Sequence, residues 1–181
     1  IEIDIIILAT LADIRFQYFK ESLALTPRFI LLEKVIFQSK VEFQNAIDLL
    51  QQKSVKVFGN LPRRYFKNYN LVKSKNLDIN KVSITGPDFG LLCNSIHYID
   101  LVQYLTNEKV IKHCASMGWC AAENKRGATF LEGEGTLIFT TEKGVVLEIV
   151  SDSKMYTDVV VEIRSASKIF RFNESKSEGL E

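Results

Sequence analysis

Lys34 is the residue of this chain whose position is most informative about chemistry. The apolar run Phe29–Leu32 is followed directly by Glu33 and Lys34. Open α/β sheets bind their ligands at the carboxyl ends of strands, so a lysine placed there faces a ligand. Its ammonium group could stabilise the oxyanion that forms when a hydroxyl loses hydride. We therefore predict that Lys34 is catalytic; the alternative is an exposed loop lysine paired with Glu33.

His97 is the second candidate catalytic residue. It lies near the start of a predicted helix, and Asp100 follows it by three residues on the same side of that helix. A histidine titrates near neutral pH, which suits it to act as the general base for an alcohol. Asp100 could orient the ring or cap a neighbouring loop. The alternative is a partly buried structural histidine. The other histidine, His113, lies in a predicted strand beside Cys114, and we interpret it as structural.

Three more candidates stand at or beyond the ends of predicted strands. Thr10 ends the first strand and could line a nicotinamide pocket through its backbone, or could be a simple turn residue. Asn60 and the pair Arg63–Arg64 follow the third strand. An arginine there could clamp a carboxylate or phosphate with two hydrogen bonds. The alternative is a surface pair at a domain junction.

Composition excludes several classes of protein. The 181 residues are 46% hydrophobic, and 23 basic against 22 acidic residues give a net charge of +1. This balance argues against a nucleic-acid partner, which would favour a basic surplus. Three cysteines without metal-ligand spacing predict no metal site and a reduced, cytoplasmic setting. The absence of an apolar run long enough to span a bilayer predicts no membrane partner.

Residues 1–58 alternate between strand and helix patterns. Short apolar strands are predicted over 3–9, 28–32 and 55–58, with helices over 14–25 and 39–50. Ser39 and Glu42 form a capping box at the second helix. The nearly continuous apolar run of the first strand predicts burial on both faces. The β-α-β-α-β order predicts parallel strands, the second half of a Rossmann-like dinucleotide-binding sheet.

Residues 59–181 follow a different pattern, typical of an α+β substrate-binding or oligomerisation domain. Two helices are predicted near 65–74 and 95–105, followed by strands over 110–117, 128–140, 144–151, 157–163 and 167–172. These strands predict a largely antiparallel open sheet with a hairpin turn at 142–144. The fold class is therefore α/β plus α+β. Residues 174–181 are polar and without pattern, so we expect them to be disordered or derived from a tag.

Four segments in order carry a resemblance to a known family. They are Ile5–Thr10, Leu31–Lys34, Val57–Arg64 and Gly90–Leu101. These segments resemble the glucose-fructose oxidoreductase / inositol dehydrogenase / rhizopine-catabolism (Gfo/Idh/MocA) family of NAD(P)-dependent oxidoreductases. The resemblance implies a lysine, Lys34, that contacts nicotinamide and substrate, and a general acid/base, His97. It implies a cofactor, NAD or NADP, and a sugar, cyclitol or sugar nucleotide as substrate.

The resemblance assigns the remaining site residues to two groups. The cofactor group is Thr10, Glu33 and Lys34. The substrate group is Asn60, Arg64, Cys93, Asn94 and His97.

The sequence departs from the family pattern at several places. Val35 stands in place of a proline, Arg15 where a histidine is frequent, and Cys93 where many members have an aspartate. No G-x-G-x-x-G occurs, so we expect this chain to lack the opening strands of a nucleotide fold.

We therefore expect a fragment of a dehydrogenase acting on CH–OH groups, inactive by itself, with weak or absent NAD binding. We also expect a homodimer or higher oligomer through the C-terminal sheet. The alternative is a non-catalytic sugar- or cofactor-sensing or oligomerisation protein of the same fold.

Overall fold

The chain divides into two compact units, each with its own hydrophobic core. The computed structural model describes residues 2–119, 131–174 and 178–180. Unit 1 is Ile1–Leu61 and unit 2 is Pro62–Glu181. The core of unit 1 joins strands to two helices, and that of unit 2 joins a larger sheet to its helices.

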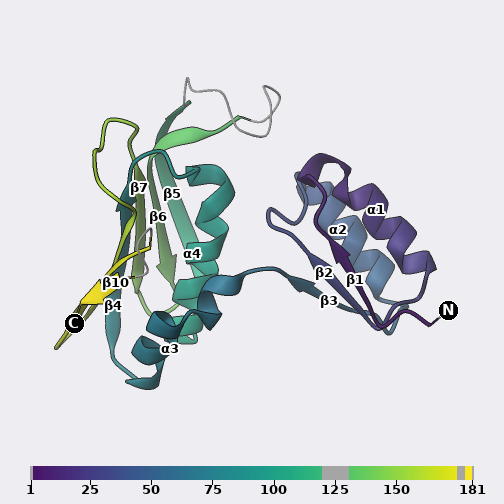
Figure 1. The fold of residues 1–181 in the computed structure, drawn as a ribbon, viewed down its shortest axis with the longest axis horizontal. Helices are drawn as coiled ribbons and strands as arrows, with labels where there is room; N and C mark the ends of the chain where they lie inside the picture. The colour runs from purple at the N-terminus through teal and green to yellow at the C-terminus, as the bar shows by residue number, and fades with distance from the viewer. Residues whose placement is uncertain (1, 120–130, 175–177, 181) are drawn as a thin grey trace. The chain divides into compact units, whose positions relative to one another are not determined.

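Unit 1 is a three-stranded parallel sheet with two crossover helices (Figure 1). Its elements are β1 (Ile5–Leu8), α1 (Ala12–Ala24), β2 (Phe29–Leu32), α2 (Lys40–Leu50) and β3 (Lys56–Gly59). The strand order is β1-β2-β3, with both pairs parallel. The hydroxyl of Ser39 accepts a hydrogen bond of 3.1 Å from the Glu42 amide, as the capping box predicts. The β-α-β-α-β half-sheet is confirmed.

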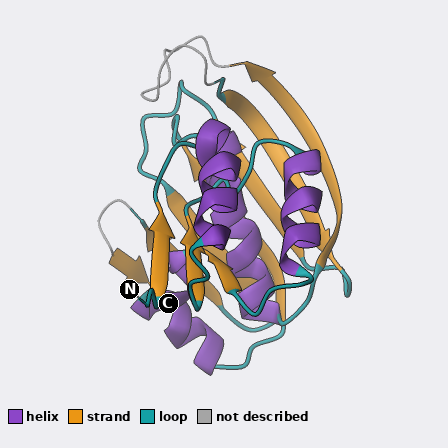
Figure 2. Cartoon of the chain, turned by 90° about the vertical axis from the view of Figure 1, so that its right-hand side faces the viewer, coloured by secondary structure: helices purple, strands orange, loops and turns teal. Residues whose placement is uncertain are grey.

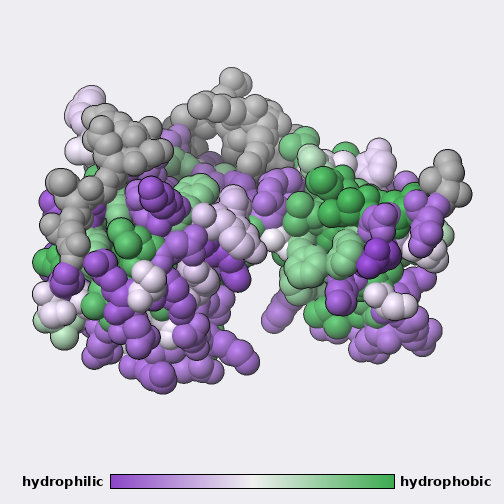
Figure 3. Space-filling view, turned by 60° about the horizontal axis from the view of Figure 1, so that its bottom comes forward, coloured by the Kyte–Doolittle hydropathy of each residue, from purple (hydrophilic) through white to green (hydrophobic). Residues whose placement is uncertain are grey.

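Only one face of this sheet is covered. Leu8, Ile30 and Leu32 pack against residues of α1 and α2, because consecutive right-handed crossovers place both helices on one face. On the opposite face Ile5 is 53% exposed and Ile7 is 62% exposed. The prediction that the first strand is buried on both faces is therefore wrong in this structure. Figure 3 shows hydrophobic residues at the surface of unit 1.

Unit 2 is an α+β unit built on one seven-stranded sheet. Its helical elements are η1 (Pro62–Tyr65), α3 (Lys67–Ser74) and α4 (Leu91–Thr106). Its strands are β4 (Ile79–Gly86), β5 (Val110–Trp119), β6 (Gly133–Thr141), β7 (Val146–Ser151), β8 (Val160–Ser165), β9 (Ile169–Asn173) and β10 (Glu178–Leu180). The order is β10-β9-β8-β4-β7-β6-β5, and β4 with β7 is the parallel pair. The largely antiparallel sheet is confirmed.

Helix α4 packs on this sheet, as Figure 1 shows. Figure 2 distinguishes the helices and strands of the chain by colour. Leu101 and Val102 of α4 share a fully buried core with Ile84, Leu147 and Ile149 of the central strands. The buried strand residues alternate with partly exposed ones, so a single face of each strand meets the helix. The helix that carries His97 is thereby fixed to the sheet.

A buried ion pair holds the end of β9 against the helical side of unit 2. The guanidinium Nη2 of Arg63 lies 2.8 Å from Oε2 of Glu174. The hydroxyls of Tyr69 and Tyr98 donate to the same carboxylate over 2.6 and 2.9 Å. Glu174 is the first residue of the segment 174–181 that we expect to be disordered or derived from a tag, and its side chain is 14% exposed in this ion pair. Glu178–Leu180 forms β10 and pairs with β9, whereas residues 175–177 and 181 lie outside the described residues.

Glu174 should make the free energy of unfolding of unit 2 fall at low pH. Burial alone raises the pKa of Glu174, but hydrogen bonds and charge from Arg63, with the two tyrosine hydroxyls, outweigh burial and bring that pKa below 4.5. The unfolded state therefore takes up the proton first, and stability falls as pH drops below 4.5. Glu174→Gln should remove this dependence and lower the free energy of unfolding at pH 7 by about 3 kcal/mol.

Urea titrations followed through the amide signals of β8 and β9 would measure both effects. Glu148→Gln is the matched control, because Glu148 forms a more exposed ion pair of 2.7 Å with Lys81 in the same sheet. That change should cost less than about 1 kcal/mol. An equal acid dependence in the Glu174→Gln variant and in the unmodified chain would contradict this account.

Candidate functional site

The first group of predicted site residues lies at the carboxyl edge of the unit 1 sheet. Thr10, Glu33 and Asn60 follow β1, β2 and β3, whose parallel carboxyl ends meet at one edge. The Asn60 side-chain amide donates to Oε1 of Glu33. The Asn60 backbone amide donates to Leu32 over 2.7 Å. The structure thus brings Glu33 and Asn60 into contact, with Lys34 directly after Glu33.

The buried side chain of Arg15 organises this edge. Its guanidinium Nη1 donates to the carbonyl of Glu33 over 2.7 Å and also to that of Val35. Its Nη2 donates to the carbonyl of Thr10. Arg15 is 2% exposed, so a charged fork inside unit 1 fixes the backbone on both sides of Lys34. The peptide bond between Lys34 and Val35 is cis.

The role of Arg15 was missed from the sequence, where it stood only as a departure from the family pattern. Its partners lie up to 21 residues away along the chain. One signal in the sequence could have indicated this role. An arginine in the first turn of a helix that follows a strand can reach the backbone carbonyls at the end of the neighbouring strand. Nothing in the local pattern indicated that its side chain is buried.

The second group of predicted residues lies in the first two turns of α4. Cys93 and His97 are one turn apart and therefore share a side of the helix. His97 is 7% exposed, and the Asn94 side-chain amide donates to the carbonyl of Phe89 over 2.5 Å. The helix starts at Leu91 with Gly90 as N-cap, earlier than the expected start near residue 95.

Arg64 is engaged by a carboxylate of the chain itself. Its Nε donates to Oδ2 of Asp100 over 2.9 Å, and its Nη2 pairs with Oδ1. The hydrogen bond to Asp100 raises the pKa of Arg64. Arg64 thus ties η1 to α4, and both oxygens of Asp100 are occupied by it. The substrate-binding role of Arg64 and the ring-orienting role of Asp100 stay predictions.

Glu132 is a polar residue near this second group that sequence reasoning did not find. It precedes β6, and its Oε1 accepts a hydrogen bond of 2.6 Å from the Leu92 amide at the start of α4. The two residues are 40 positions apart in the chain. No local pattern indicates this contact, because it arises from the packing of α4 on the sheet.

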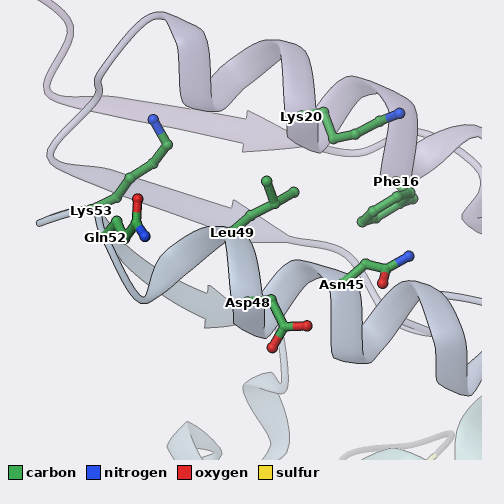
Figure 4. Close-up of a pocket in the computed structure, with 7 residues that line it drawn as sticks. All are labelled: Phe16, Lys20, Asn45, Asp48, Leu49, Gln52 and Lys53. Atoms are coloured by element: carbon green, nitrogen blue, oxygen red, sulfur yellow. The ribbon is translucent and has the colours of Figure 1, made fainter.

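A separate groove in unit 1 contains none of the predicted site residues (Figure 4). It has a volume of about 640 Å³ and lies between α1 and the end of α2. Its walls are formed by Phe16, Lys20, Asn45, Asp48, Leu49, Gln52 and Lys53. The predicted site residues of unit 1 and this groove therefore lie at different places.

The residues that the structure describes contain no group of three or more histidine, cysteine, aspartate or glutamate residues placed to hold a metal ion. Across the same described ranges, no helix combines the length and apolar character needed to cross a bilayer.

Comparison with solved structures identifies the fold. A dehydrogenase (MviM) from Clostridium difficile matches 94% of this chain at 19% identity with a TM-score of 0.69. Scyllo-inositol dehydrogenase from Lactobacillus casei, solved with NAD(H) and scyllo-inositol, matches 94% at 18% identity with a TM-score of 0.71. The chain has the Gfo/Idh/MocA-type dehydrogenase fold. The resemblance inferred from four sequence segments is thereby confirmed for the fold.

The same fold also occurs in a regulatory protein. A super-repressor mutant of Gal80p from Saccharomyces cerevisiae matches 96% of this chain at 14% identity with a TM-score of 0.74. The chain spans only 56 or 57% of the length of these three structures. No family model and no curated protein matches the sequence.

Replacing Arg15 should loosen the edge that carries Lys34. Arg15→Lys keeps the charge but loses the planar fork, so we expect the free energy of unfolding of unit 1 to fall by about 3 kcal/mol. Arg28→Lys is the matched control, because Arg28 forms an exposed pair with Asp4. It should cost less than about 0.5 kcal/mol. Urea titration followed through the amide signals of unit 1 compares the two variants. Equal losses of unfolding free energy would refute the proposal that Arg15 holds this edge together.

Proposed function

We propose that this chain is part of an NAD(P)-dependent oxidoreductase that oxidises a hydroxyl of a sugar, cyclitol or sugar nucleotide. The observation that carries the proposal is the fold match over 94% of the chain to a dehydrogenase solved with NAD(H) and scyllo-inositol. Two positions support it. Lys34 follows the carboxyl end of β2, where open α/β sheets bind ligands, and His97, a residue type suited to act as a general base, lies in α4.

In the proposed reaction, His97 and Lys34 have different roles in the oxidation of the substrate hydroxyl. His97 takes the hydroxyl proton as the general base. The ammonium group of Lys34 stabilises the negative charge that develops on the substrate oxygen. The nicotinamide, when bound, accepts the hydride. The ketone product then leaves, and the proton on His97 passes to water.

The other predicted residues position these two groups in the proposal. Thr10, Glu33 and Lys34 belong to the cofactor side, in a unit that would bind the dinucleotide. Arg15 holds the backbone around Lys34 through the carbonyls on either side of it. The proposed substrate contacts in unit 2 are Cys93, Asn94, His97 and Arg64. Asn60 of unit 1 is also predicted to bind substrate.

A specific observation favours a second candidate, a non-catalytic sensor of sugar or cofactor. The Gal80p super-repressor matches this chain with a TM-score of 0.74, slightly above the value of 0.71 for the scyllo-inositol dehydrogenase. Cys93 also supplies no negative charge at the position four residues before His97. Such a protein would bind NAD(P) or a sugar and act through protein contacts without turnover.

The proposal includes a homodimer or higher oligomer formed through the sheet of unit 2. Strand β5 lies at one edge of that sheet. Its apolar residues Ile111 and Trp119 are 56% and 68% exposed. A symmetric partner could cover this edge, because an exposed strand and its apolar side chains favour pairing with a second copy.

Substitution of the two proposed catalytic residues tests the proposed reaction. In the full-length protein, His97→Gln should lower kcat by about 10²–10⁴-fold, because the general base is lost. Lys34→Ala should lower it by about 10²–10³-fold. His113→Gln in β5 and the exposed Lys53→Ala are the controls and should leave kcat within about twofold. Formation of reduced nicotinamide is measured across a panel of sugars and cyclitols.

Two results would separate the candidates. Loss of turnover in both variants, with the controls unaffected, supports the dehydrogenase. Full-length protein that binds NAD but reduces none with any member of the panel would refute the enzyme and favour the sensor.

The 181-residue chain should bind NAD weakly or not at all. Its sequence contains no glycine-rich phosphate turn, which supplies the backbone amides that hold the pyrophosphate. Calorimetric titration of the chain with NAD is expected to give no heat at micromolar concentrations. A dissociation constant in the micromolar range would contradict the prediction, and the full-length protein serves as the positive control.

A further inference from the structure

The amino end of α4 is occupied by a carboxylate from a distant part of the chain. Oε1 of Glu132 accepts hydrogen bonds from the Leu92 amide over 2.6 Å and from the Gly133 amide over 3.0 Å. The Glu132 residue is 9% exposed. Both of these donors are neutral backbone amides, so the carboxylate of Glu132 lies at the start of the helix that carries His97.

The second oxygen of this carboxylate faces Cys93 and Asn94. A Cβ placed on Gly90 would lie 2.8 Å from Sγ of Cys93, 3.2 Å from Nδ2 of Asn94 and 3.2 Å from Oε2 of Glu132. The three polar atoms thus surround one point above Gly90. Gly90 has a φ of +78°, so both its backbone and the lack of space require glycine.

This arrangement reverses the usual preference of a helix amino end. Free backbone amides and the helix dipole normally attract anions there. In this chain the protein's own carboxylate takes that place and leaves a negative oxygen beside the thiol of Cys93. A second anion brought to within a few ångströms of Glu132 would be repelled. This repulsion should lower its binding affinity or its reaction rate by about tenfold or more.

We propose that Glu132 sets the charge selectivity of the site around Cys93 and Asn94. The site favours an uncharged polyhydroxy ligand and rejects one that brings a carboxylate or phosphate to these residues. That the ligand is the substrate rests on the proposed function. Within that function, the inference narrows the substrate to a neutral sugar or cyclitol at this position, in preference to a uronic acid or sugar phosphate.

Alkylation of Cys93 tests the inference on the 181-residue chain, without cofactor or turnover. Cys114→Ser and Cys120→Ser leave Cys93 as the reporter thiol. Iodoacetate is anionic and iodoacetamide is neutral, and both react with the thiolate by displacing iodide. The ratio of their rates therefore cancels the thiolate fraction and reports how strongly the site repels an anion.

Glu132→Gln should raise the iodoacetate-to-iodoacetamide rate ratio by about tenfold. Glutamine keeps a carbonyl oxygen to accept from the Leu92 amide, so the helix cap is retained. Glu142→Gln is the matched control, because Glu142 is exposed beyond the other end of β6 and loses the same charge. It should leave the ratio unchanged. An equal ratio in the Glu132→Gln variant and its parent would overturn the inference.

Salt provides a test that needs no change at Glu132. In the parent chain, raising ionic strength from about 0.01 M to 1 M should raise the same ratio several-fold, because salt screens the repulsion. A flat response would overturn the inference even if the Glu132→Gln variant failed to fold.

Full-length protein extends the test to turnover and separates it from the proposed function. There, Glu132→Gln should shift the kcat/KM preference about tenfold from a neutral sugar toward the matching uronic acid. An unchanged preference would overturn the role of Glu132 in substrate choice. Absence of turnover with every substrate would refute the dehydrogenase instead, and the alkylation ratio would still decide whether the site excludes anions.

Discussion

The buried guanidinium of Arg15 is the interaction on which the candidate site of unit 1 depends. Strand ends leave backbone carbonyls without partners, and a buried carbonyl without a donor is costly. Arg15 supplies donors to the carbonyls of Thr10, Glu33, Val35 and Ile36 from one planar group. The segment around Lys34 is therefore held by a rigid fork, which gives the lysine a defined starting point for its side chain.

Unit 2 uses the same physical device at three places. At each of these places a charged side chain bonds to a residue that is distant in the sequence. Glu132 caps α4, Arg64 ties η1 to Asp100, and Arg63 ties η1 to Glu174. Charge-assisted hydrogen bonds are directional, so they fix the rotation and start of an element where apolar packing alone would allow slippage. The helix that carries His97 is fixed in this way at its amino end.

The elements were predictable from the sequence because their signals are local. The β-α-β-α-β order, the Ser39 cap and the hairpin turn at residues 142–144 all follow from patterns of a few residues. The placement of Glu33 and Asn60 at one sheet edge also followed, since parallel strands align their ends. Contacts such as Arg63 with Glu174, 111 positions apart, depend on packing that no local pattern encodes.

Two departures from the family pattern acquire a physical meaning in the structure. Arg15 replaces a frequent histidine and becomes the clamp of the unit 1 edge. Cys93 replaces a frequent aspartate, yet a carboxylate is still present beside it, because Glu132, the residue before β6, reaches the same space above Gly90. Loss of a charged motif residue need not leave the site without that charge, since a residue from another part of the chain can supply it. Cys93 alone is therefore weak support for the non-catalytic alternative.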